Sequence, residues 1–166
     1  MNAETVKNKY KQVENALKAK AWFKKDGWQV STHPFPEKKP TGITFQVFKK
    51  HWFNADSHGI HIESHLDYNP KKQQKAYLTI HLLHEEKIPG TKIKRIALTK
   101  PIIDEVYTTV AEWPNYKFRV GKYGQQPFTL ILDGSSSKFE TELEKEVTRL
   151  CKLFGPLIDK TLLNLL

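Results

Sequence analysis

Four side chains that could coordinate a metal ion or exchange protons stand close together in the middle of the sequence. His61, Glu63 and His65 occupy alternate positions, and His81 lies in the next apolar segment. On a strand, side chains two residues apart are roughly 7 Å apart, so such residues can share one ion. The single cysteine, Cys151, allows neither an internal disulfide nor a four-cysteine zinc site. A divalent metal held by imidazole and carboxylate groups is therefore the metal chemistry open to this chain.

Three predicted strands position these residues. Alternation of apolar and polar side chains is clearest in the second strand, where histidine and acidic residues point away from the apolar side. The third segment repeats the pattern, with His81 on its polar side. The strands are expected at residues 43–53, 60–68 and 76–86, joined by turns at 54–59 and 69–74.

Matching the apolar faces of the second and third strands predicts a hairpin with Glu63 opposite His81. His61 and His65 then lie diagonally beside His81, but about 13 Å from each other along the strand. Since that separation is too long for one ion, the predicted metal ligands are Glu63 and His81 with either His61 or His65. The competing interpretation is a solvent-facing polar surface with a Glu63–His81 ion pair contributing well under ~1 kcal/mol.

The remaining pattern predicts one α+β domain over residues 1–166. Residues 6–21 repeat apolar side chains at helical spacing, residues 101–113 predict a second helix, and Ser137 with Glu140 predicts a capping box that opens the last helix. Residues 36–42 are expected to form a loop. We expect a mostly antiparallel sheet of five to six strands with helices packed on one face, leaving the other partly open, in the order α-β(3-4)-α-β-β-α. Further strands are expected at residues 27–35, 116–123 and 127–133.

The formal net charge of +9 predicts attraction to anionic partners. Our leading hypothesis from the sequence is a small non-enzymatic binding domain that engages nucleic acid or an acidic protein. Aromatic residues among the lysines, such as Trp52, could stack on bases or serve as core anchors. The predicted polyanion-binding residues are Lys7, Lys11, Lys18, Lys25, Lys49, Lys50, Lys92, Lys94 and Arg95.

An acid-x-lysine triplet, Glu85 and Lys87, ends the third predicted strand. With Glu63 on the second strand, and with the order of helix, hairpin sheet and helix, this part of the chain resembles the core of the PD-(D/E)xK nucleases. That resemblance implies a metal-dependent phosphodiesterase or nuclease using Glu63, Glu85 and Lys87. No Pro-Asp pair precedes the second strand.

The element order is also similar to that of the secretion-chaperone fold, whose members bind extended protein segments as dimers. It implies a third hypothesis, a dimeric adaptor whose homodimer forms through the apolar C-terminal helix. Glycine-rich phosphate loops are missing, so no nucleotide cofactor is expected. The sequence shows no export signal and no long apolar run, so we predict a cytoplasmic protein without a membrane span.

Overall fold

The computed structural model describes residues 1–36, 38–69 and 73–166, so parts of the predicted loop at 36–42 and turn at 69–74 lie outside the described residues. A six-stranded antiparallel sheet and four helices are found there, which confirms the predicted α+β class. The helices are α1 Ala3–Lys18, α2 Ala21–Lys25, α3 Arg95–Ala111 and α4 Phe139–Leu165, with a short 3-10 turn, η1, at Lys50–Trp52. The strands are β1 Trp28–Phe35, β2 Gly42–Lys49, β3 Ile60–Asp67, β4 Lys75–Leu82, β5 Lys117–Phe118 and β6 Phe128–Asp133.

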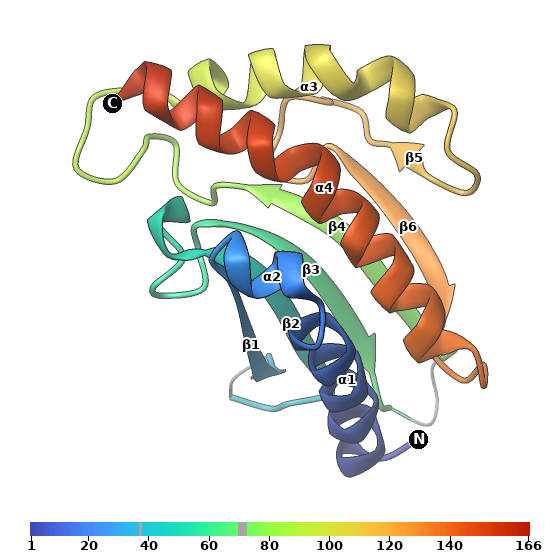
Figure 1. Ribbon diagram of the computed structural model, residues 1–166. Helices are drawn as coiled ribbons and strands as arrows, with labels where there is room; N and C mark the ends of the chain where they lie inside the picture. Colours follow the sequence, from blue (N-terminus) through green and yellow to red (C-terminus); the bar gives the residue numbers. More distant parts are fainter. Residues whose placement is uncertain (37, 70–72) are drawn as a thin grey trace.

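The sheet has the spatial order β1-β2-β3-β4-β6-β5, and helices cover one of its faces. Helices α1 and α4 cross that face, and α3 packs against α4 (Figure 1). Tyr10 of α1 shows how the layers join: its ring stacks on Phe45 of β2 at 5.1 Å, and its hydroxyl lies 3.1 Å from the Ser64 hydroxyl of β3. Burial of each such apolar side chain contributes roughly 1.5–3 kcal/mol to the free energy of unfolding.

The register of the central hairpin differs from the prediction by two residues. His61 is paired with His81, and Glu63 is paired with Thr79. A shift of two residues leaves every side chain on its own face, so alternation alone cannot distinguish the two registers. The predicted pairing of Glu63 opposite His81 is therefore wrong, while the assignment of both residues to the polar face is correct.

The ends of the helices depart from the sequence pattern at three points. The first predicted helix is divided into α1 and α2, and α3 begins at Arg95, ahead of the predicted start. No side chain caps α4, which begins at Phe139, so the predicted Ser137 capping box is not formed. Gly155 lies inside α4, where a Cβ would be 2.8 Å from the indole of Trp28, so the glycine permits a close helix–strand contact. Among the described helices, none is long and apolar enough to cross a membrane.

Candidate metal centre

The polar face of β1–β4 forms the floor of a groove with a volume of about 800 Å³. One end of the groove is lined by Phe35 and His65, and the other by Glu63, His81 and His84. The chain that links β2 to β3 borders this second end through residues 56–58. The groove therefore extends across several strands from an aromatic end to a histidine-rich end.

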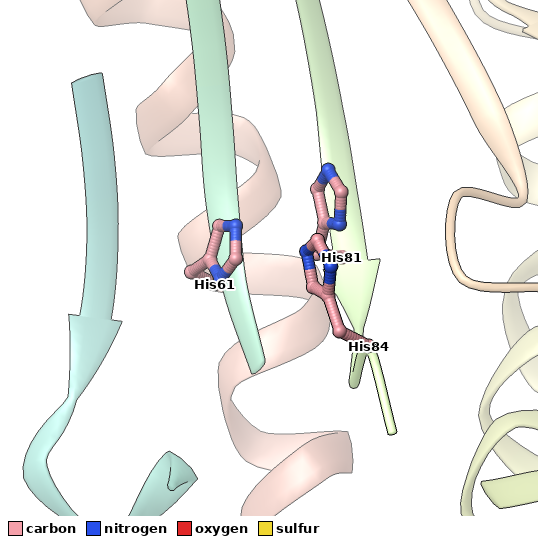
Figure 2. A group of neighbouring side chains, drawn as sticks. All are labelled: His61, His81 and His84. Atoms are coloured by element: carbon pink, nitrogen blue, oxygen red, sulfur yellow. The ribbon is translucent and has the colours of Figure 1, made fainter. Parts of the chain in front are cut away.

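Three histidines stack at the second end of the groove (Figure 2). His61 comes from β3, His81 from the neighbouring position on β4, and His84 from the segment just after β4. Ring centroids are 4.6 Å apart both for His61 and His81 and for His81 and His84. One ligand nitrogen of each residue lies within 4.8 Å of the other two. We call these three residues the histidine cluster.

Two members of the cluster are buried, which contradicts the solvent-facing interpretation at this end of the sheet. His61 is 0% exposed and His81 is 3% exposed. The segment around Phe53 folds closely over Gly59. Only a glycine allows this approach, because a Cβ at position 59 would lie 2.1 Å from the carbonyl oxygen of Phe53. Further along the same face, His65 is partly exposed, so the face is more open there.

His84 reaches the cluster because the backbone turns immediately before it. Leu83 has a φ of 76°, a left-handed conformation that ends the alternation of β4, and its side chain is buried. The His84 amide then donates to the His58 carbonyl at 2.9 Å, while the His84 carbonyl accepts from the Arg95 guanidinium at 3.0 Å and the Gln125 amide at 2.8 Å. His84 was not among the ligands predicted from the sequence. The available signal was the Leu82-Leu83 pair, which breaks the alternation.

Glu63 connects two of the histidines. Its Oε2 lies 3.3 Å from His61 Nε2, and its Oε1 lies 3.3 Å from His81 Nε2. The predicted Glu63–His81 contact thus exists, although it runs diagonally between the strands. Burial opposes ionisation of this carboxyl, but its contacts with His61 and His81 outweigh it and hold the pKa of Glu63 well below its usual range.

Two histidines of the cluster, His61 and His84, are shifted toward their neutral form. Burial lowers the pKa of His61 below its ordinary value. Burial, together with repulsion from His81 and His61, lowers the pKa of His84 to about 4. An ionised carboxylate beside neutral imidazoles is the protonation state that metal binding requires, because a protonated imidazole nitrogen cannot ligate.

Two ring nitrogens in the cluster are buried without a hydrogen-bond partner in the described structure: His81 Nδ1 and His84 Nε2. Leaving such an atom buried and unpaired costs about 1–3 kcal/mol, and an unpaired group in a folded protein often marks a place where an ion or water binds. These two nitrogens come from neighbouring rings of one stack.

A zinc-type ion would require a modest closure of the cluster. With N–metal bonds near 2.1 Å and tetrahedral angles, ligand nitrogens lie about 3.4 Å apart. The rings would also turn out of their stack, because the lone pair of an imidazole nitrogen lies in the ring plane. His61 and His81 sit on paired strands, whereas His84 lies beyond the last residue of β4, so closure is easiest at His84.

His65, the other predicted histidine ligand, is not part of the cluster. It pairs with Tyr77 across the hairpin, its Nδ1 lies 3.2 Å from the Thr44 hydroxyl, and its Nε2 lies 3.6 Å from Asp67. The structure therefore places His61, and not His65, with Glu63 and His81.

The predicted nuclease residues are not brought together either. Glu85 and Lys87 lie beyond the end of β4, both are exposed, and neither lines the groove. The Glu85 backbone carbonyl instead accepts from the Arg95 guanidinium at 3.1 Å. Within the described part of the chain, Glu63 is the member of the predicted trio that lies at the candidate site.

The predicted polyanion-binding residues fall into two groups. Four have partners inside the protein: Lys11 and Lys18 pair with Glu14, Lys49 pairs with Asp159 at 2.6 Å, and Arg95 binds backbone carbonyls. The others are exposed and make no ion pair within residues 1–36, 38–69 and 73–166. These are Lys7, Lys25, Lys50, Lys92 and Lys94. Trp52 is fully buried and donates to Asp159 at 2.8 Å, which confirms it as a core anchor.

Comparisons with protein-family models, with curated proteins and with solved structures found no match to this chain. Any assignment of function therefore depends on the site itself.

Proposed function

We propose that the histidine cluster binds one divalent transition-metal ion and that the ion acts on an anionic ligand in the groove, as in metal-dependent phosphodiesterases. The observation that carries this proposal is the meeting of His61, His81 and His84, with ligand nitrogens within 4.8 Å, beside the Glu63 carboxylate. Imidazole ligands of this kind suit Zn²⁺ and its neighbours in the first transition row.

The charge of the groove supports an anionic ligand only when the ion is bound. Among the residues that the structure describes, the lining has one permanent cation, Lys38, and two carboxylates, Asp56 and Glu63, so with neutral histidines their formal charge is +1 − 2 = −1. A divalent ion changes this to +1. Binding of a phosphate ester in the groove should therefore depend on the metal.

The chemistry expected of the site follows from its residues. A bound divalent ion polarises a phosphoryl oxygen and lowers the pKa of a bound water. Glu63, ionised and in contact with two histidines, would accept a hydrogen bond from that water and orient it. This proposal replaces the ligand set implied by the nuclease resemblance, because Glu85 and Lys87 lie outside the groove.

A cobalt titration tests the proposal. Protein purified without a histidine tag is freed of metal, titrated with Co²⁺, and followed by visible absorption for the intense bands of a low-symmetry, four- or five-coordinate site. We expect one Co²⁺ per chain and hydrolysis of bis(p-nitrophenyl) phosphate that requires added metal. Absence of saturable binding would refute the metal site, and saturable binding without hydrolysis would refute the enzymatic role.

A separate observation supports the polyanion hypothesis for another part of the surface. Five exposed lysines make no ion pair in the described chain, and none of them lines the groove. We propose that Lys25 and Lys50 contribute to a non-specific contact with nucleic acid, outside the metal site. An acidic protein surface is the alternative partner, and a cytoplasmic location stays a prediction.

Salt dependence tests that second proposal. The logarithm of the binding constant for duplex DNA should fall with the logarithm of salt concentration, with a slope that decreases by about 0.9 for each lost phosphate contact. The Lys25→Gln and Lys50→Gln double variant should reduce the slope, whereas the control Lys18→Gln, whose lysine already pairs with Glu14, should leave it nearly unchanged. Binding indifferent to salt would contradict the proposal.

A further inference from the structure

The hydrogen-bond network around His61 fixes where the protons of its ring lie. It begins at a backbone amide, which can only donate: the Gly59 N–H donates to Asn54 Oδ1 at 3.0 Å. That bond identifies the Asn54 atom as an oxygen acceptor. His61 Nδ1 lies 2.8 Å from the same oxygen, so Nδ1 must carry a proton and donate it.

The other end of the Asn54 side chain fixes the orientation of Gln46. Asn54 Nδ2 donates to Gln46 Oε1 at 3.1 Å, which leaves the Gln46 amide nitrogen facing His61 Nε2 at 3.1 Å. An amide nitrogen can only donate, and the two protons of Gln46 Nε2 have three acceptors within reach: His61 Nε2 at 3.1 Å, Glu63 Oε2 at 3.2 Å and the Ser57 carbonyl at 3.4 Å. His61 Nε2 lies closest, so it accepts one of them and carries its lone pair. Both ends of the ring are thereby specified by one network.

All three side chains of this network are buried. Asn54 is 4% exposed, Gln46 is 1% exposed and His61 is 0% exposed. Solvent therefore does not compete for these hydrogen bonds, and a flipped amide would set donor against donor or acceptor against acceptor at a cost of about 1–3 kcal/mol for each unsatisfied group.

We propose that Asn54 and Gln46 are positioning residues that hold His61 in the tautomer with the proton on Nδ1. His61 Nε2 is then the nitrogen presented to the metal ion and to Glu63, from which it is 3.3 Å away. Hydrogen bonds from the second ring nitrogen to an oxygen acceptor orient metal-bound histidines in this way. The tautomer stands on the hydrogen-bond network alone, and only its use in metal binding rests on the proposed function.

Nitrogen NMR of the histidine side chains, on protein without added metal at neutral pH, measures the tautomer directly. We expect the His61 resonances to show a protonated Nδ1 and an unprotonated Nε2. A proton on Nε2 in the wild-type protein would overturn the assignment, whatever the protein does with metal.

The Gln46→Glu variant tests whether Gln46 holds His61 in this tautomer. It keeps the size of the side chain but replaces the amide donor by a carboxylate oxygen, so a proton should appear on His61 Nε2. Co²⁺ affinity should fall by about 10–100-fold. The control Gln29→Glu makes the same change at an exposed position of β1. It should alter neither the His61 nitrogen resonances nor the affinity for Co²⁺. An unchanged His61 spectrum in Gln46→Glu would refute the positioning role, while a changed spectrum with unchanged Co²⁺ affinity would refute only its link to the metal.

Discussion

Replacement of His84 by glutamine is the sharpest single perturbation of the proposed metal centre. The side chain supplies a buried ring nitrogen without a hydrogen-bond partner and stacks on His81 at 4.6 Å. Outer-shell substitutions typically reduce metal affinity 10–100-fold, so loss of a direct ligand should reduce it by at least about 100-fold, or about 2.7 kcal/mol. Loss of the ring stack should cost the fold only about 0.5–1.5 kcal/mol, because His84 lies outside the strands.

Isothermal titration with Zn²⁺ in a buffer of known zinc affinity measures the metal affinity, and urea unfolding measures the stability of the fold. His65→Gln is the matched control, since it makes the same substitution on the same face, 16 residues from His81 in sequence and outside the cluster. We expect His84→Gln to weaken zinc binding and His65→Gln to leave it within about threefold of wild type. Equal losses in the two variants, or unchanged binding in His84→Gln, would refute the assignment of the cluster as the site.

Three further predictions address stability and assembly. The pKa of His84 is lower in the folded than in the unfolded chain, so the free energy of unfolding should fall as pH decreases from about 6.5 to about 4. His84→Gln should remove about 1 kcal/mol of that fall, measured by urea denaturation at several pH values. An unchanged pH profile in the variant would contradict this. Asp159→Asn should destabilise the fold by about 1–3 kcal/mol, because the nearly buried Lys49 loses its charged partner. Asp104→Asn, at an exposed ion pair, should cost much less, and similar shifts of the melting temperature in the two variants would contradict the argument. Leu163, at the end of α4, is 82% exposed and offers an apolar contact for the predicted homodimer. Light scattering should give a mass near twice 19.3 kDa for the wild type and half that mass for Leu163→Glu. A monomeric wild type would refute the dimer.

The faces of the central strands could be predicted from the sequence because alternation has a period of two. Ile62 and His61 were thus assigned correctly to opposite faces of the sheet. The register could not be predicted, since pairing Glu63 with Thr79 or with His81 leaves every face unchanged. The length of the turn between β3 and β4 decides between these two registers, and sequence patterns specify turn length poorly.

The candidate site could be predicted only in part for a related reason. Glu63, His61 and His81 follow from the strand pattern, whereas His84 depends on a left-handed backbone at Leu83 that a leucine rarely adopts. The burial of His61 depends on the segment before Gly59 folding over the sheet, which is a tertiary contact. The roles of Asn54 and Gln46 arise from the same contact, because these residues meet His61 only in the folded chain.

Anomalous diffraction at the zinc edge, from crystals of the protein grown with Zn²⁺, tests the central claim most directly. The account predicts one strong peak bonded to His61 Nε2 and to ring nitrogens of His81 and His84, close to the Glu63 carboxylate. A peak at His65 and Asp67, or no peak within the groove at saturating zinc, would contradict it.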